Sequence, residues 1–341
     1  MSQKRFVIVF LATSVVLISI YAWVFHEQFG APVAAEYWVG QARTVKAATA
    51  TTVVGNKVLV VAGSSGLFGI DSAVMEAEVH RPVINMALHA GLSMDWLLKY
   101  ADENSKNGDV IFMPLEYEYF VSDFFLPSAW MSTPVVAWDS DYFYRLDLIQ
   151  KIQFATSMAP SEVAANMIAK LNRTNVLAQF PDRAIIPLVK LLNNFERQTD
   201  STDVYSYLNM DLHGDIKGSC HTHPPSSIEN ESYFLSPGSQ VNPATLSALV
   251  SASKKMEAQG KRLIVGFQPI ALNSVTTQHW FGFKSSEIES SLRTAGLRVL
   301  GSPSDYYFNT TDFFDTPYHL NCDARSVRSK LLGKQLHTAL Q

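Results

Sequence analysis

Two adjacent serines follow a short apolar run near residue 60. Residues 58–62 read VLVVA, and the chain continues as Gly63-Ser64-Ser65-Gly66. A β-branched run of this length, closed by small residues, predicts a buried parallel strand that carries a loop to the carboxyl edge of a sheet. The glycines permit a sharp turn and the close approach of a ligand, so a serine here could act as a nucleophile. A plain strand-to-helix turn is the alternative interpretation.

A carboxylate and an imidazole lie close together near the other end of the chain. Asp315 precedes His319 by four residues, ahead of a helical pattern around residues 324–332. A histidine can take a proton from a serine hydroxyl, and an aspartate can hold that histidine in the required tautomer. Asp312 is a second candidate for the carboxylate. The structural alternative is that Asp315 and His319 only cap the last helix.

These segments together resemble the SGNH/GDSL hydrolase superfamily. The similarity is greater to its membrane-anchored branch, which includes the alginate O-acetylation proteins and the lipoteichoic acid D-alanylation protein, and it spans roughly residues 57–332. The Gly-x-Ser motif of that superfamily implies Ser65 as the nucleophile, with Ser64 as the fallback. It also implies His319 as the general base and Asp315 as its partner, although the superfamily usually has Asp-x-x-His.

Two further positions correspond to the oxyanion-binding groups of the resembled families. Gly91 matches the glycine after the second strand, whose N–H donates to the oxyanion, and it is alternatively only a turn before a helix capped by Ser93. Glu116 falls near the position of the asparagine of the usual Gly-x-Asn-Asp block. An ionised carboxylate there would repel an oxyanion. Either another group donates, or Glu116 holds a proton or a sugar hydroxyl, or acyl chemistry is absent.

Strand patterns alternate with helix patterns along most of the chain. This alternation predicts an α/β fold with a doubly wound parallel sheet, and the resemblance implies the three-layer SGNH arrangement. The serine turn and the Asp315/His319 loop are then expected at one edge of the sheet. The predicted strands are residues 58–62, 82–86, 109–113, 262–267 and 297–300, and residues 130–192 are expected to be mainly helical.

The first residues have the pattern of a membrane anchor. Residues 6–25 carry no charge, are long enough to cross a bilayer and follow Lys4 and Arg5. This predicts a single-pass protein of the bacterial inner membrane, with a cytoplasmic N-terminus and a periplasmic domain. A signal peptide cleaved near residues 33–35 is the competing interpretation. Residues 1–26 are thus the expected anchor, residues 27–56 a linker and residues 57–341 the SGNH-like domain.

Residues 198–242 are expected to form a long polar loop inserted in that domain. It contains His213, Cys220, His221 and His223, which could supply zinc ligands, form part of a lid over a glycan groove, or lie in an ordinary surface loop. The expectation is no metal and no cofactor. Cys220 and the chain's other cysteine, Cys322, suit an oxidising compartment, where they could pair or stay free.

Location and chemistry together suggest acyl-ester chemistry on a glycan. The net charge of −4 gives no basic surface, so nucleic acid is not an expected partner. The prediction is a serine O-acetyltransferase or esterase that modifies an exported polysaccharide, alongside a membrane-bound O-acyltransferase. A non-catalytic glycan-binding or scaffolding protein is the alternative. The aromatic side chains expected to stack on sugars are Trp96, Tyr117, Tyr119, Phe120, Trp130 and Trp138.

Overall fold

The computed structural model describes residues 3–122, 129–197, 203–220 and 223–341. The chain divides into two compact units, and the boundary between them falls inside helix α2 (Tyr37–Thr52). Unit 1 contains residues 1–40 and 129–186, and unit 2 contains residues 41–128 and 187–341. The two units are described separately below.

Unit 2 is built around a parallel sheet. Its strands are β1 (Val58–Val60), β2 (Val83–Asn85), β3 (Val110–Leu115) and β4 (Arg262–Phe267), in the order β2-β1-β3-β4. The strands read as continuous apolar runs because both faces of the sheet are covered. The chain passes from β1 outward to β2 and then back across to β3. The carboxyl ends of β1 and β3 therefore flank the switch point at which open α/β sheets place their ligands.

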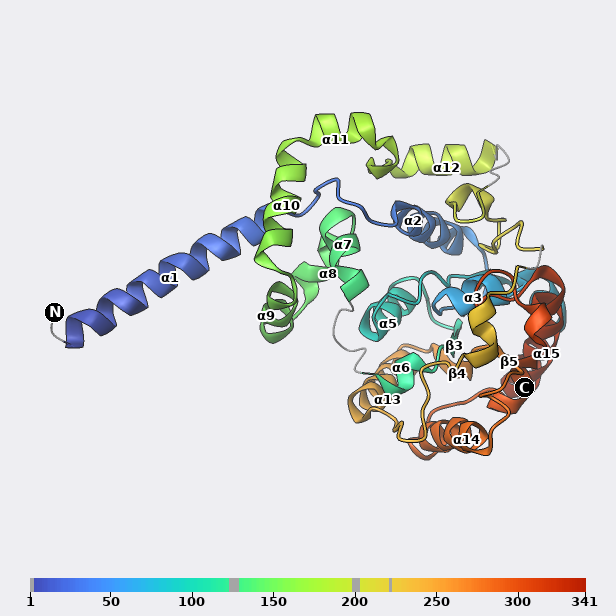
Figure 1. The fold of residues 1–341 in the computed structure, drawn as a ribbon. Helices are drawn as coiled ribbons and strands as arrows, with labels where there is room; N and C mark the ends of the chain where they lie inside the picture. The colour runs from blue at the N-terminus through green and yellow to red at the C-terminus, as the bar shows by residue number, and fades with distance from the viewer. Residues whose placement is uncertain (1–2, 123–128, 198–202, 221–222) are drawn as a thin grey trace. The chain divides into compact units, whose positions relative to one another are not determined.

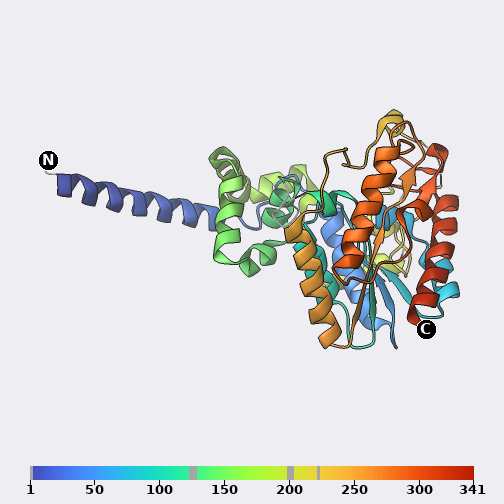
Figure 2. The ribbon, with the colours of Figure 1, turned by 90° about the horizontal axis from the view of Figure 1, so that it is seen from below.

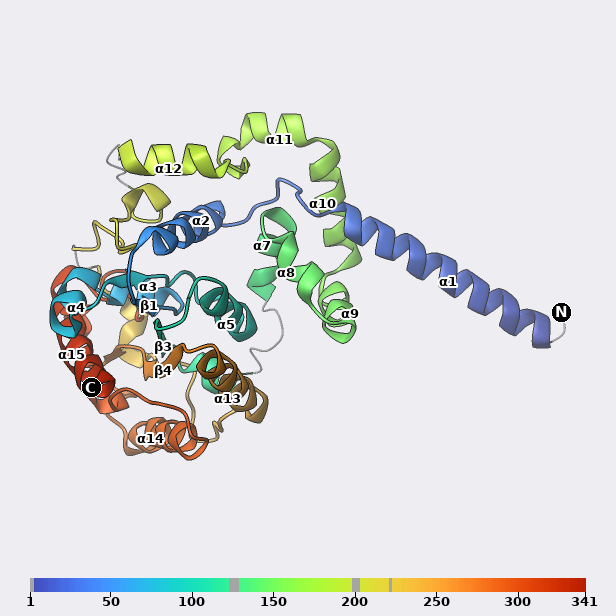
Figure 3. The same cartoon turned by 180° about the vertical axis from the view of Figure 1, so that it is seen from behind.

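Helices lie on both sides of these strands. Helix α4 (Ser72–Val79) packs against α15 (Cys322–Leu340), whereas α5 (Met94–Glu103) packs against α13 (Pro243–Ala258). Figures 1 and 3 show the first pair on one side of the strands and the second pair on the other. The mixed α/β architecture with a parallel sheet is thus as predicted.

Several local signals determine where these elements begin. The Asp71 carboxylate accepts the N–H of Val74 and caps α4, and Asn321 caps α15 through the N–H of Ala324. The remaining elements of unit 2 are short or peripheral. They are α3 (Ser64–Gly69), α6 (Glu118–Val121), α12 (Leu188–Arg197), α14 (His279–Thr294), β5 (Ile270–Ala271), β6 (Tyr307–Phe308) and the 3-10 turns Tyr207–Asn209, Ser226–Asn230, Pro303–Tyr306 and Thr310–Asp312.

Unit 1 is helical and begins with the long apolar helix α1 (Gln3–Glu27). Figure 2 shows α1 extending from the short helices of its own unit. α1 is the one helix among the described residues that is long and apolar enough to cross a membrane. The other helices of this unit are α7 (Ala129–Ala137), α8 (Ser140–Arg145), α9 (Leu148–Ser157), α10 (Pro160–Leu171), α11 (Arg173–Gln179) and the turn Pro181–Arg183.

Two expectations about local structure were wrong. Residues 27–56 contain helix α2 rather than only an extended linker, and Ala42, Val45 and Lys46 of that helix are buried. Its alanine- and threonine-rich sequence lacks an apolar period, so its helical character depends on packing. The predicted strand at residues 297–300 is reduced to an isolated parallel bridge between Val299 and Val265.

Candidate functional site

The serine turn and the Asp315/His319 loop come together in unit 2. Helix α3 begins at Ser64, directly after the Gly63 turn that follows β1. One turn further along α3, the Phe68 ring stacks on the His319 imidazole, with centroids 4.0 Å apart and planes 16° apart. The predicted meeting of these distant segments at the carboxyl edge of the sheet is therefore observed.

His319 is oriented by the carboxylate that precedes it. His319 Nδ1 lies 2.8 Å from Asp315 Oδ1, and the imidazole side chain is almost fully buried. Burial lowers the pKa of His319, and the nearby Asp315 opposes that shift without cancelling it. With Nδ1–H donating to Asp315, Nε2 is the unprotonated nitrogen, so this histidine is neutral at pH 7 and equipped to accept a proton.

Tyr205 completes this part of the site, and its role was missed by the sequence analysis. Its hydroxyl donates to Asp315 Oδ2 at 2.5 Å and lies 3.4 Å from His319 Nδ1. Burial raises the pKa of Asp315, but the hydrogen bonds from His319 and Tyr205 outweigh that effect, and the net shift is downward. Asp315 is therefore ionised. Tyr205 comes from the long inserted loop, 110 residues before Asp315 in the sequence. No local sequence pattern predicts a contact between residues so far apart.

Glu116 occupies the backbone donors of the serine turn. Its Oε1 accepts the N–H of Ser65 at 3.0 Å, and its Oε2 accepts the N–H of Gly63 at 3.3 Å. The carboxyl group is fully buried, and burial raises its pKa, although the hydrogen bonds from the Ser65 and Gly63 groups oppose the shift. A Cβ at Gly63 would lie 2.5 Å from Glu116 Oε1, so only glycine allows this approach.

The two serines differ in exposure. The Ser65 side chain is fully buried near Glu116, and its Oγ makes no well-formed hydrogen bond to any residue in the described ranges. Ser64 is partly exposed. Neither hydroxyl is hydrogen-bonded to His319 within the part of the chain that the structure describes. The structure thus brings serine and histidine to one site without joining them.

A buried arginine holds the other side of the serine turn. Arg328 of α15 donates through Nη1 to the carbonyl oxygens of Ser65 and Gly69, at 3.4 and 3.1 Å, and through Nη2 to that of Phe267 at 2.8 Å. Burial lowers the pKa of Arg328 to about 10, so it stays charged at neutral pH. Its positive charge lies near the Glu116 carboxylate and partly compensates that buried anion.

Gly91 does not face the serine turn with a free amide. Its N–H donates to His89 Nδ1 at 2.9 Å, two residues earlier in the same loop. The predicted oxyanion role of Gly91 requires this N–H, which another group occupies in this structure. The neighbouring Ala90 approaches Gly63, and the Tyr119 hydroxyl ties the same loop down by donating to the carbonyl oxygens of Ala90 and Leu92.

The expectation that six aromatic side chains stack on sugars was wrong for four of them. Burial leaves Trp96, Tyr117, Tyr119 and Phe120 less than 5 % exposed, so these rings belong to the core of unit 2 and cannot stack on a sugar. Trp130 and Trp138 belong to unit 1.

A different aromatic pair includes Tyr318, the residue that precedes His319. Phe234 is 53 % exposed and stacks on Tyr318, with ring centroids 6.3 Å apart. Tyr233 and Phe234 both have positive φ values, 53° and 61°, which are strained for such residues. The Tyr233 hydroxyl secures this conformation by donating to Pro317 O and accepting from Ala271 N. The fold thus holds one aromatic ring out toward solvent, against the residue that precedes the candidate base in the sequence.

The inserted loop is tied to the site by a disulfide. Cys220 and Cys322 are bonded, which decides between the two sequence-based alternatives. Because Cys220 is in a disulfide, it cannot be a thiolate ligand. No group of three metal-ligating side chains occurs among the described residues. His213 lies near Glu76 and Asp211, while His221 lies outside the described residues.

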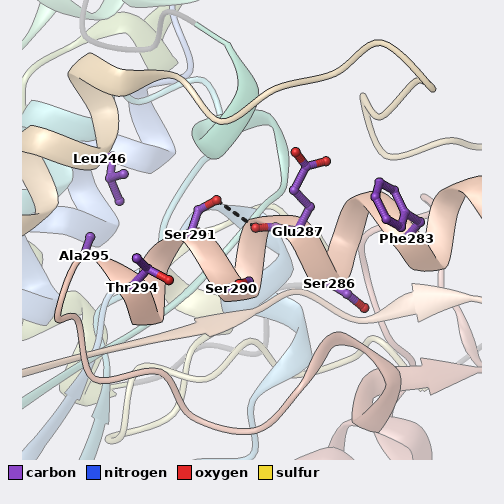
Figure 4. A pocket seen from close by; sticks show the side chains of 8 residues that line it. All are labelled: Leu246, Phe283, Ser286, Glu287, Ser290, Ser291, Thr294 and Ala295. Carbon is purple, nitrogen blue, oxygen red and sulfur yellow. Dashed lines mark hydrogen bonds between the residues drawn. The ribbon is translucent and has the colours of Figure 1, made fainter.

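The pocket in Figure 4 is separate from this site. It runs along α14 and reaches Leu246 of α13, and none of the site residues lines it. Its polar lining consists of short hydroxyls and Glu287, and the Ser291 hydroxyl donates to the Glu287 carbonyl within the helix. This surface offers no arrangement of groups for catalysis.

Comparisons with known proteins identify no relative. The chain matches no family model, and neither a curated protein nor a solved structure is significantly similar to it.

Proposed function

We propose that this chain is a membrane-anchored, serine-dependent acyl esterase or O-acyltransferase with the three-layer SGNH arrangement. The observation that carries the proposal is His319, which is buried, neutral and oriented by Asp315, and which stacks on the helix that begins with the serine pair. A base whose pKa is lowered by burial remains unprotonated at neutral pH, as proton abstraction from a hydroxyl requires.

In this proposal Ser65 is the nucleophile. Its backbone N–H donates to Glu116 Oε1, so an ester carbonyl oxygen that displaces this carboxylate would accept the same N–H and lie next to Ser65 Oγ. His319 takes the proton from Ser65 Oγ as that oxygen bonds to the acyl carbon. The imidazolium then returns the proton to the leaving alcohol oxygen as the ester bond breaks, and Asp315 stabilises the transient positive charge. Water or a second alcohol accepts the acyl group in the second half-reaction.

The proposed acceptor is a carbohydrate. Phe234 is exposed and stacks on Tyr318, the residue that precedes His319, and the apolar faces of sugar rings pack well on such rings. Glu118 is a polar neighbour of Tyr318. Burial and the nearby Glu116 raise the pKa of Glu118 to about 7. We further propose that the acyl group comes from a membrane-bound O-acyltransferase and that the glycan is an exported bacterial polysaccharide.

The proposed location is the outer face of the bacterial inner membrane, with a retained anchor. Phe25 of α1 is buried and packs against Phe29, whose ring lies 5.0 Å from that of Phe143. Cleavage near residues 33–35 would remove both rings from the core of unit 1. This packing supports an anchor rather than a cleaved signal peptide, and the disulfide supports an oxidising compartment.

A second candidate is a non-catalytic, SGNH-like accessory protein. The specific observation in its favour is the Glu116 carboxylate, which occupies the N–H groups of Gly63 and Ser65 that an oxyanion would need. An ionised carboxylate at this place excludes an oxyanion by repulsion as well as by volume.

A fluorophosphonate probe on the full-length protein in detergent separates the two candidates. The enzyme proposal predicts covalent labelling of wild type that Ser65→Ala and His319→Ala abolish and that Ser64→Ala retains. Intact disulfide and unchanged thermal unfolding serve as folding controls for each variant. A wild-type protein that stays unlabelled at pH 7–9, while binding glycan, would support the accessory role.

A further inference from the structure

Helix α9 of unit 1 exposes apolar side chains that its own unit does not cover. Leu148, Ile149 and Ile152 are 74 %, 69 % and 56 % exposed. Residues spaced i, i+1 and i+4 share one side of a helix, so these three form a continuous apolar edge. The opposite side of α9 carries Phe154, which is buried. The inner side of α9 is therefore packed, and its outer apolar edge is left open by unit 1.

The position of α9 along α1 is defined by direct contacts. The Tyr21 hydroxyl of α1 donates to the Ala155 carbonyl oxygen of α9 at 2.9 Å. One turn later, the Phe25 ring lies 6.3 Å from the Phe154 ring. Both contacts fall in the last turns of the uncharged run 6–25. α9 thus lies at the level where the apolar surface of α1 ends.

Hydrogen bonds from α10 and α11 reach the residues that follow that apolar run. Lys170 of α10 donates to the Glu27 carbonyl oxygen, and Asn166 donates to Gln28 Oε1 at 2.9 Å. Arg173 of α11 donates to the Gly30 carbonyl oxygen at 2.8 Å. Figure 1 shows α9 and α10 at the C-terminal end of α1. Through Tyr21 and Phe25, α9 contacts the last turns of the apolar part of α1.

We infer that α9 lies in the headgroup region of the bilayer that α1 crosses, with Leu148, Ile149 and Ile152 inserted among the lipid acyl chains. The exposed apolar surface of α1 is long enough to cross a bilayer, and the apolar edge of α9 lies at the end of that surface. Amphipathic helices at membrane interfaces bury such an edge in the same way. The occupant of this surface is therefore phospholipid, and the inference does not depend on catalytic activity.

Site-specific fluorescence in vesicles tests this inference. The two native cysteines form a disulfide, so a single added cysteine can carry an environment-sensitive nitrobenzoxadiazole label. The full chain with Ile149→Cys is reconstituted into phosphatidylethanolamine/phosphatidylglycerol vesicles that contain a doxyl-labelled lipid. Val15→Cys in α1 is the inserted reference, and Thr174→Cys on the exposed side of α11 is the aqueous control.

The expected result is blue-shifted emission at position 149, with quenching by doxyl lipid several-fold stronger than at position 174 and close to that at position 15. Equal quenching at positions 149 and 174 would overturn the inference. Blue-shifted emission at 149 without lipid quenching would also overturn it, since protein rather than lipid would then cover the edge. A Val15→Cys label that is not quenched would remove the membrane premise itself.

Discussion

The two halves of the candidate site are prepared to different degrees. On one side, His319 is buried, neutral and held by Asp315, which in turn accepts from Tyr205. On the other side, Ser65 is buried without a hydrogen bond to the histidine, and the adjacent backbone donors are occupied by Glu116. The histidine half has the features of a catalytic base, whereas the serine half is closed by a carboxylate. Whether this site can perform acyl chemistry therefore depends on whether the Glu116 carboxylate leaves the backbone N–H groups of Gly63 and Ser65 free for an oxyanion.

Removing the base should have the largest effect. If His319 takes the proton from Ser65, His319→Ala should lower the rate of fluorophosphonate labelling by about a thousandfold or more. The measurement is the second-order rate constant for labelling, followed by mass spectrometry. His319→Gln is the matched control, because it keeps a polar side chain of similar size in the buried position. Labelling of either variant at the wild-type rate would show that the histidine half is not catalytic.

Replacing the carboxylate should open the serine half. Glu116→Gln removes the negative charge and supplies an N–H donor, so the labelling rate should rise by about tenfold to a hundredfold. Glu118→Gln, two residues away and only half buried, is the matched control and should change the rate little. A Glu116→Gln variant that labels more slowly than wild type would mean that the carboxylate assists the reaction.

Glu116→Gln should also change the stability of the fold, and this effect can be measured whether or not the protein is an enzyme. Because folding raises the pKa of Glu116, this group disfavours the folded state once it is ionised, and stability falls as pH rises from its ordinary pKa through the raised one. Glu116→Gln should therefore unfold at a higher temperature than wild type at pH 8, with a smaller difference at pH 4. Thermal unfolding by circular dichroism at both pH values checks this. A larger gain at pH 4 would contradict the assignment of a buried ionised carboxylate.

Tyr205 should tune the histidine half more modestly. Tyr205→Phe removes one hydrogen bond to Asp315, which corresponds to about a fivefold loss in rate. The carboxylate then interacts more strongly with the imidazole, so the pKa of His319 should rise and the acid limb of the pH–rate profile should move to higher pH. The profile of labelling rate from pH 5 to 9 reports this shift. A rate loss without any shift would indicate a purely structural role.

The smallest effect is expected from Phe234→Ala, which changes a side chain that takes no part in the proposed proton or acyl transfer. If Phe234 supports a sugar ring, Phe234→Ala should raise the KM for an oligosaccharide acceptor about fivefold. Hydrolysis of p-nitrophenyl acetate should be unchanged, because that small ester does not reach the ring. Phe283→Ala, which removes an exposed ring on α14, is the matched control. Equal effects of Phe234→Ala on both substrates would argue against a glycan platform.

Local sequence signals predicted the sheet well and the site only in part. The four parallel strands were recognised because run length and β-branching act over a few positions. Tyr205 and Arg328 reach the site from distant segments, and no local pattern reports such contacts. The core aromatics were mistaken for surface ones because a buried Tyr119 satisfies its hydroxyl with backbone carbonyls of another loop.

The most direct test of the central claim is to map the modified residue after fluorophosphonate treatment of wild type and Glu116→Gln at pH 8. If Ser65 is the nucleophile, both proteins should carry one adduct, on Ser65, and it should form faster in the variant. An adduct on Ser64 would transfer the nucleophile to the partly exposed serine. No adduct in either protein would contradict the claim that this site performs acyl chemistry.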